Sequence, residues 1–183
     1  MSKAILWMAN GVEECEALLV VDLLRRAGVD IQTASIHDDI FVLSSHGIQI
    51  KADVPAAEAD YASADLVILP GGKVGTENLS SCALVREQSV AFAGSKKVAA
   101  ICAAPSILAS LGLLEGKKAT VHPGFESKMH GASLTHSPVA VDGNIITGRA
   151  LGAAIPFSLE LIRQLEGEKS AKKVAEAICY TEY

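Results

Sequence analysis

The stretch VAAICAAPSIL, residues 98–108, reads as a buried strand that runs directly into a helix. Its first residues form a short, continuous apolar run, which is typical of a strand covered on both faces of a sheet. Pro105 favours the first turn of a helix, because proline lacks an N–H group and that turn leaves such groups unpaired. The stretch therefore predicts a strand, a tight turn and a helix, with Cys102 at the turn.

The rest of the chain repeats this alternation of short apolar runs and longer helical patterns. Strands are expected at 4–9, 30–36, 65–70, 96–102, 118–121 and 144–147, and helices at 15–27, 79–93, 104–111, 152–165 and 168–179. Residues 40–43 and 48–50, separated by SSHG, predict a hairpin off the main sheet. Strands that alternate with helices form a mostly parallel sheet with helices on both faces. The predicted fold class is α/β, in a single domain over residues 1–183.

Composition narrows the classes of function. The 183 residues are 50% hydrophobic and only 4% aromatic, so the core should consist mainly of Ala, Val, Ile and Leu. The net charge is −5, and no run of Lys and Arg is longer than a pair. These features argue against a nucleic-acid or anionic membrane surface as partner. A small molecule or a protein is the expected partner.

Localisation and metal binding are judged from the N-terminus and the cysteines. The first apolar run is about six residues long, too short for the core of a signal peptide. No later run is long enough for a membrane span, so we expect a cytoplasmic protein. The four cysteines lie far apart without a C-x-x-C pair, which predicts reduced thiols and no metal site.

Cys102 is the first candidate for chemistry. Small residues stand two positions before and after it, as the tight turn of a nucleophile elbow requires. The following helix should point its N-terminus at the sulfur, which favours the thiolate and predicts a lowered pKa. The alternative is a small buried hydrophobe in an alanine-rich core. Local sequence leaves both interpretations open.

Glu16 is the second candidate. It falls at the N-terminal end of the apolar stripe that should face the sheet, a stripe continued by Val20, Leu23, Leu24 and Ala27. Glu14 is instead expected to point toward solvent. Burial should raise the pKa of Glu16, and a protonated carboxyl can donate a hydrogen bond to a thiolate. The alternative is a helix start that favours acidic residues for the dipole alone.

The loop PGGKVGTENL, residues 70–79, is the third candidate. Backbone N–H groups at Gly71 and Gly72 are free to approach a ligand, because glycine has no Cβ. The glycine spacing matches neither a dinucleotide fingerprint nor a phosphate loop, so no cofactor is expected. An oxyanion-binding site is one interpretation, and a plain turn between strand and helix is the other.

His122 and Arg149 each follow a predicted strand and are weaker candidates. His122, in TVHPG, would lie near the same sheet edge as Cys102. Arg149, in ITGRALG, could bind an anion, although a surface salt bridge is the default expectation. The other four histidines lie in expected loops without the spacing of metal ligands.

Five of these motifs, in the same order and across nearly the whole chain, resemble the DJ-1/ThiJ/PfpI superfamily, most closely its small DJ-1-like branch. They are ANGVEECEALLVVDLLRRAG, DLVILPGG, VAAICAAP, TVHPG and ITGR. The resemblance implies a flavodoxin-like α/β/α sandwich, a homodimer and a reactive cysteine on a strained elbow. It also implies that Cys102 is the nucleophile and Glu16 the protonated carboxyl bonded to it. The N–H groups of Gly72 and Ala103 would form the oxyanion pocket, with His122 in the pocket.

Two departures from that pattern concern the pocket. His46 stands where members of this branch carry an arginine that reaches toward the partner subunit's site. Residues 150–154 read ALGAA, where relatives often have Gly-Pro-Gly-Thr, so the pocket wall that includes Arg149 differs.

The resemblance leaves three functions to compare. The leading one is a cofactor-independent glyoxalase or deglycase that acts on small dicarbonyls such as methylglyoxal. The second is a redox sensor or stress chaperone that uses oxidation of Cys102. The third is an intracellular cysteine peptidase, which would need a base such as His122 and an acid to orient it.

Overall fold

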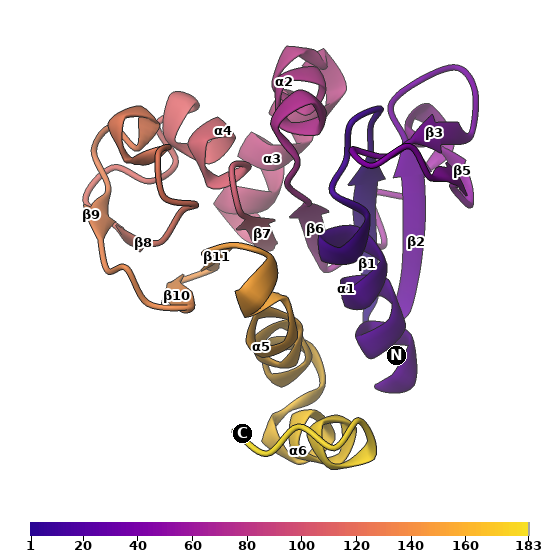
Figure 1. Cartoon of the computed structure of the whole chain (residues 1–183), viewed down its shortest axis with the longest axis vertical. Coiled ribbons are helices and arrows are strands. Elements are labelled where there is room, and N and C mark those ends of the chain that lie inside the picture. The colour runs from indigo at the N-terminus through magenta and orange to yellow at the C-terminus, as the bar shows by residue number, and fades with distance from the viewer. Residues whose placement is uncertain (183) are drawn as a thin grey trace.

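A mostly parallel sheet forms the centre of the protein (Figure 1). The computed structural model describes residues 1–182, so Tyr183, the last residue of the predicted domain, lies outside the described part. The strand order is β10-β11-β7-β6-β1-β2-β5, and only the β10–β11 pair is antiparallel. The strands are β1 (Lys3–Met8), β2 (Asp30–Ser35), β5 (Val54–Pro55), β6 (Leu66–Leu69), β7 (Lys97–Ile101), β10 (Val139–Asp142) and β11 (Ile145–Gly148).

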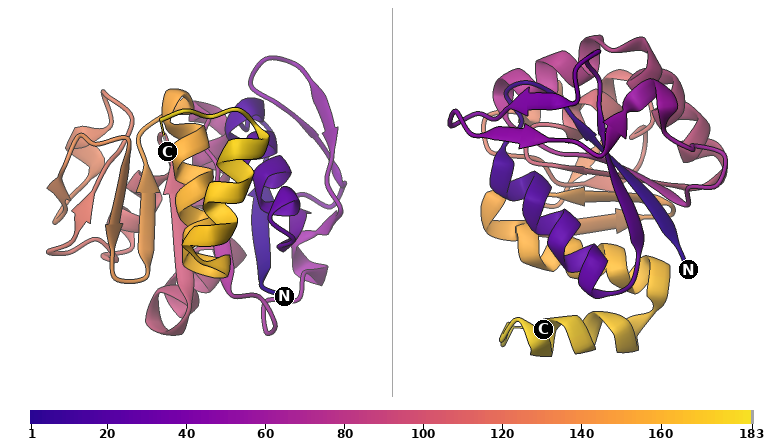
Figure 2. Two further views of the ribbon diagram at one scale, coloured as in Figure 1. Left: turned by 90° about the horizontal axis from the view of Figure 1, so that it is seen from below. Right: turned by 90° about the vertical axis from the view of Figure 1, so that its right-hand side faces the viewer.

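Helices cover both faces of this sheet, as Figure 2 shows. One layer contains α1 (Glu14–Arg26), α5 (Ala154–Glu166) and α6 (Glu168–Ala177). The other contains α2 (Lys73–Ser81), α3 (Ala83–Ser95) and α4 (Pro105–Ser110). Along β1, Leu6 and Met8 point into the first core, while Ile5 and Trp7 point into the second, because side chains alternate along a strand. The predicted α/β/α sandwich is confirmed.

The structure confirms the predicted hairpin and differs from the prediction in other details. Helix α2 occupies most of the segment that was expected to be a loop. The strand expected at 118–121 is only β8 (Lys118–Ala119), and it pairs with β9 (Ser133–Leu134) in a separate small sheet. The predicted hairpin is present as β3 (Phe41–Leu43) and β4 (Gln49–Lys51), also apart from the main sheet. The chain also contains three-residue 3-10 turns, which are too short to leave a periodic pattern in the sequence. They are η1 (Ala56–Glu58), η2 (Glu126–Lys128) and η3 (Leu151–Ala153).

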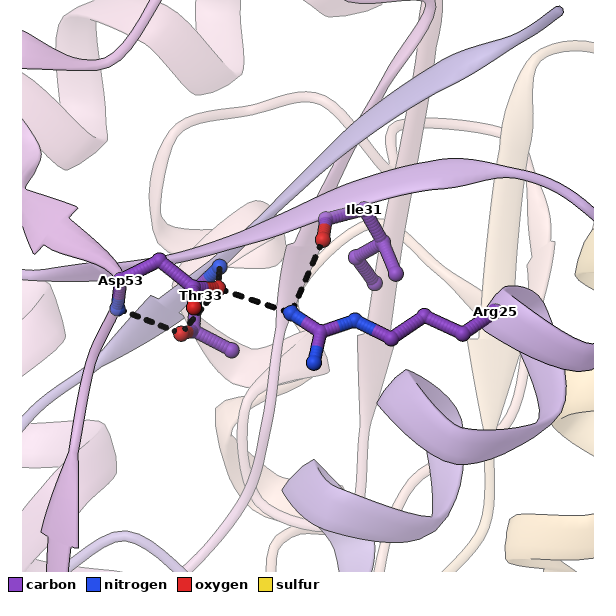
Figure 3. Close-up of polar contacts among 4 residues, drawn as sticks. All are labelled: Arg25, Ile31, Thr33 and Asp53. Atoms are coloured by element: carbon purple, nitrogen blue, oxygen red, sulfur yellow. Dashed lines mark hydrogen bonds and ion pairs between the residues drawn. The ribbon is translucent and has the colours of Figure 1, made fainter.

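Polar contacts fix both ends of α1. At its start the Glu13 carboxylate caps the helix by accepting a hydrogen bond of 2.6 Å from the Glu16 N–H. At its end Arg25 donates to the Asp53 carboxylate at 2.9 Å, and this carboxylate also accepts from the N–H and the hydroxyl of Thr33 (Figure 3). The network ties α1 to the β2 edge of the sheet, which fixes the position of Glu16.

Two further findings bear on localisation. None of the helices over residues 1–182 is both long enough and apolar enough to cross a membrane. Four cysteines are free thiols: Cys15, Cys82, Cys102 and Cys179. Cys15 and Cys179 are exposed, and the other two are partly buried.

Candidate active site

Three neighbouring strands end at the candidate site. β6 pairs with β1 on one side and with β7 on the other, all parallel, so their carboxyl ends lie at one edge of the sheet. The chain after β1 leads to Glu16, the chain after β6 is Gly71-Gly72, and the residue after β7 is Cys102. In open α/β sheets, ligands bind at this edge where the strand order changes direction, as it does here between β1 and β6.

Cys102 has an unusual backbone conformation. Its φ is +66°, in the left-handed region that disfavours residues with a Cβ. Two backbone hydrogen bonds fix it there: its N–H donates to the Gly148 carbonyl at 3.0 Å, and its carbonyl accepts from the His122 N–H at 2.8 Å. Such strain persists only where the surrounding structure holds it, and it concentrates at functional sites.

Gly71 lies between the thiol and the carboxyl. A Cβ at this position would lie 2.5 Å from the Cys102 Cβ and 3.1 Å from its Sγ, and it would also collide with Oε2 of Glu16. Only glycine therefore allows the side chains of Cys102 and Glu16 to approach each other here. Gly72, at φ +91°, allows the chain to turn into α2.

Glu16 lies beneath this loop and is only 1% exposed. Burial raises its pKa to about 7, and the nearby Glu13 charge adds to the rise. The nearby Cys102 thiol and the backbone of Gly71 and Leu151 act in the opposite direction and limit the rise of this pKa. Oε2 of Glu16 has no hydrogen-bond partner among the described residues. Protonation would remove the cost of burying an unpaired negative charge at this oxygen.

The predicted lowering of the Cys102 pKa is wrong. The pKa of the thiol is raised to about 12. Burial is the largest cause and the neighbouring Glu16 carboxyl the second, whereas the N–H groups of Gly72 and Ala103 act to lower the pKa. The six-residue helix α4 does not offset this desolvation. The contribution from the Glu16 charge exists only while Glu16 is ionised. Thiolate formation at neutral pH therefore requires that Glu16 keep its proton.

His122 adjoins the thiol through the backbone bond to the Cys102 carbonyl. Its ring contacts Phe125 edge-on, with centroids 6.2 Å apart, and Nδ1 lies 2.6 Å from the Pro123 carbonyl oxygen. Because a carbonyl can only accept, Nδ1 carries the proton, which leaves Nε2 as an acceptor in the neutral ring. Among the described residues no carboxylate orients this imidazole, as a peptidase triad would require.

His46 and Arg149 make their polar contacts away from the thiol. His46 Nδ1 lies 2.8 Å from Oε1 of Glu14, and its side chain is 71% exposed. Arg149 donates to the His136 carbonyl at 3.1 Å. Its neighbour Gly148 does contact the site, because the Gly148 carbonyl accepts the hydrogen bond from the Cys102 N–H. The structure thus leaves the side chains of His46 and Arg149 away from the Cys102 thiol. It brings the other candidates together: Cys102, Glu16, Gly71, Gly72, Ala103 and the His122 backbone.

Glu14 does not point into open solvent as expected, since the hairpin loop leaves it only 6% exposed. Burial alone would raise its pKa, but hydrogen bonds from its own backbone and from Ser45, Ser44 and His46 outweigh burial and lower the pKa to about 2. Glu13, Glu14 and His46 offer ligand atoms within 4.8 Å of one another. Helix capping and the Glu14 hydrogen bonds account for these groups without a cation.

Leu151 is the site residue that sequence reasoning missed as a contributor. Its backbone, in η3, lies near enough to the Glu16 carboxyl to lower the pKa of that group. A backbone donor leaves no signature in residue type, and only the unusual ALGAA segment marked this region of the sequence. That segment therefore contacts the site directly.

Known proteins resemble this chain over nearly its whole length. The model of the DJ-1/PfpI family matches residues 2–164. Protein DJ-1 homolog B of Arabidopsis thaliana is 37% identical over 179 residues, 94% of this chain and 40% of that protein. The chain thus spans less than half the length of this relative. A deglycase of Pyrococcus horikoshii is 28% identical over 169 residues, 90% of this chain and 99% of that protein. The solved structure of oxidized DJ-1 from Toxoplasma gondii has a TM-score of 0.95 at 33% identity, covering 100% of both chains.

Proposed function

The chain belongs to the DJ-1/PfpI family, and from this premise we propose that it is a cysteine-dependent enzyme acting on small reactive dicarbonyls such as methylglyoxal. In this proposal Cys102 is the nucleophile and Glu16 and His122 transfer protons. The N–H groups of Gly72 and Ala103 bind the developing oxyanion. The similar deglycase of Pyrococcus horikoshii supports carbonyl chemistry as the class of reaction.

One observation carries the proposal: a buried carboxyl with a raised pKa lies against a thiol whose backbone is at φ +66°. A structural cysteine requires neither feature, and both cost stability. Together they provide a nucleophile and a proton donor at one point, which addition to an aldehyde requires. Gly71 preserves the contact between them because it has no Cβ.

The proposed reaction balances without an outside oxidant. The thiolate adds to the aldehyde carbon of methylglyoxal, and the aldehyde oxygen takes a proton from Glu16 to give a hemithioacetal. His122 Nε2 then takes the proton from that carbon and returns it to the ketone carbon, while the hydroxyl proton of the hemithioacetal passes to the ketone oxygen, so the first carbon becomes a thioester and the second an alcohol. Water cleaves the thioester, lactate leaves and the thiol is restored. Oxidation of one carbon balances reduction of the other.

The test is lactate formation from methylglyoxal in the absence of glutathione. Cys102→Ser and Glu16→Ala should each abolish it, because one removes the nucleophile and the other the proton donor. Cys82→Ser and Glu87→Ala serve as matched controls, and circular dichroism checks that all four variants fold. Wild-type turnover in either site variant would refute the mechanism.

A second candidate, redox sensing through Cys102, is favoured by the N–H groups of Gly72 and Ala103, which lie near enough to the thiol to lower its pKa. These donors would hold the oxygens of a sulfinate as well as an oxyanion. The similar DJ-1 of Toxoplasma gondii has been solved in an oxidized form. Mass spectrometry after mild peroxide treatment is the test. Equal oxidation of Cys15, Cys82 and Cys102 would exclude a tuned sensor.

We further propose that the protein is cytoplasmic and forms a homodimer. The four free thiols support the cytoplasmic location, and the family resemblance supports the dimer. Exposed apolar side chains at the start of α1 and on the hairpin offer a contact surface: Leu18 is 42% exposed, Leu43 54% and Ile48 52%. Sedimentation should give twice the monomer mass for the wild type and a monomer for Leu18→Glu. A monomeric wild type would exclude the dimer.

A further inference from the structure

A cavity of about 420 Å³ lies between α2, α4 and the turn η2, next to the candidate active site. In Figure 1 the two helices lie at the same end of the molecule, opposite α6. We call it the hydroxyl-lined cavity, because five of its residues carry hydroxyl groups: Thr76, Ser80, Ser81, Ser106 and Ser110. Its volume suits a small ligand.

Three walls of the cavity continue into the residues around Cys102. Lys73 lines the cavity and directly follows Gly72. Ser106 also lines it, and its hydroxyl donates to the Ala103 carbonyl at 2.7 Å. Phe125 lines the third side and packs against the His122 ring. The cavity is therefore contiguous with the site while lacking Cys102 itself among its lining residues.

The charges around the cavity favour an anion. Lys73 and Lys128 line it, against a single carboxylate from Glu77 among the described residues. The Lys73 ammonium makes no hydrogen bond or ion pair with the described part of the chain, and Lys128 makes a cation-π contact with Phe125 at 5.0 Å. The cavity thus carries positive charge on a chain whose net charge is −5. Lysine ammonium groups commonly bind phosphate and carboxylate.

The hydroxyl groups favour a ligand that itself bears hydroxyls. Thr76 is 5% exposed, and its Oγ1 is buried with no hydrogen-bond partner among the described residues. A buried polar atom without a partner costs stability, so a ligand that bonds it gains affinity. Ser81, Ser106 and Ser110 donate to backbone carbonyls, which leaves their oxygens as acceptors. The wall of the cavity thus contains one buried hydroxyl without a partner among the described residues, and several acceptors beside its cations.

We propose that the hydroxyl-lined cavity binds a small hydroxylated anion, a sugar phosphate or a sugar acid. The lysines hold the anionic group, and the serine and threonine hydroxyls hold the ligand's hydroxyls. This site goes beyond the proposed function and does not depend on it, because neither Cys102 nor Glu16 lines the cavity.

Isothermal titration calorimetry tests the proposal with four probes. Glucose 6-phosphate and gluconate distinguish a phosphate from a carboxylate anion, while glucose and inorganic phosphate each lack half of the required chemistry. We expect one of the two hydroxylated anions to bind at least about fivefold more tightly than glucose or inorganic phosphate, a ratio typical of one solvent-exposed charge interaction.

Variants assign the binding to this cavity. Lys73→Ala and Lys128→Ala should each weaken binding by about fivefold. Glu77→Gln should tighten it, because among the described residues Glu77 alone lines the cavity with a carboxylate. Thr76→Val should weaken it while leaving the melting temperature unchanged or higher, since it removes an unpartnered hydroxyl. Lys172→Ala on α6 and Cys102→Ser are controls that should bind as the wild type does.

Several results would overturn the proposal. Absence of heat with both anions at millimolar concentration would overturn it, and so would binding of glucose as tight as that of both anions. Equal weakening of binding by Lys172→Ala and Lys73→Ala would show nonspecific charge attraction. Full binding by Thr76→Val would exclude a role for its hydroxyl. Because binding is measured apart from turnover, failure here leaves the proposed enzyme untouched, and an inactive enzyme leaves the binding site untouched.

Discussion

Replacement of Glu16 by glutamine should change how the stability of the fold depends on pH. Glu16 is 1% exposed, and burial raises its pKa from the ordinary 4.5 to about 7. Between these two values the folded chain keeps a proton that the unfolded chain releases. The free energy of unfolding therefore falls as the pH rises through this window. Glutamine has the same shape but does not titrate, so Glu16→Gln should lack this component.

The size of the effect follows from the two pKa values. Each pKa difference of one is worth about 1.4 kcal/mol, so the full rise from 4.5 to 7 corresponds to about 3 kcal/mol. Between pH 5 and pH 8 the wild type should lose about 2.5 kcal/mol of stability relative to Glu16→Gln. Other carboxyl groups titrate alike in both proteins, so their contributions cancel in the difference.

The assay is urea unfolding at pH 5, 6, 7 and 8, at one protein concentration, for the wild type and Glu16→Gln. Glu87→Gln, an exposed substitution on α3, is the matched control and should follow the wild type at every pH. A constant difference between the wild type and Glu16→Gln across this range would refute the reasoning, because Glu16 would then not titrate within it.

Two further substitutions test the packing of the site and of α1. Gly71→Ala should cost about 1–3 kcal/mol by overpacking and reduce lactate formation, because its Cβ would collide with Glu16 and Cys102. Gly94→Ala in α3, where a Cβ meets nothing within 4 Å, should instead stabilise the fold by up to about 1 kcal/mol. Equal melting temperatures for Gly71→Ala and Gly94→Ala would contradict the packing argument. Asp53→Asn should cost about 1–2 kcal/mol in urea unfolding at pH 7. Burial alone would raise the pKa of Asp53, but hydrogen bonds from Thr33 and Arg25 lower it. The difference in free energy of unfolding between the wild type and Asp53→Asn should therefore shrink as the pH falls below the ordinary aspartate range. A difference that grows as the pH falls would contradict this.

The sheet and the position of Glu16 could be predicted because each leaves a periodic signal. Strands β1, β6 and β7 are continuous apolar runs, and burial on both faces produces that pattern. Glu16 interrupts an apolar stripe at helical spacing, which predicts that it faces the sheet, and the side chain is 1% exposed in the structure. Periodicity reports burial, so it located the candidate carboxyl.

Helix α2 was missed because its glycines resemble a turn. Gly75 lies inside the helix, where a Cβ would approach the Gly11 carbonyl oxygen to 2.8 Å. This position requires glycine because the helix packs closely against the chain after β1. In a single sequence, a glycine required by close packing cannot be distinguished from a glycine in a loop. The same limit applies to β5 and β9, which are two-residue strands without their own periodic pattern.

The thiol pKa could not be derived from local sequence either. Sequence identifies a helix start after Cys102, but desolvation and the Glu16 charge come from segments far away in the chain, and they outweigh the local N–H groups. His46 is a second example. Its partner is Glu14, which the hairpin loop covers, and a contact between distant segments leaves no mark in either one.

Covalent trapping on Cys102 tests the central claim most directly. The protein is mixed with methylglyoxal in the absence of glutathione, quenched in acid within the first turnover, digested and analysed by mass spectrometry. The account predicts that a methylglyoxal-derived group is attached to Cys102 early in turnover, disappears as lactate forms, and is absent from Cys82 and from the Cys102→Ser protein. Lactate formation at the wild-type rate with no adduct on Cys102 at any time would contradict it.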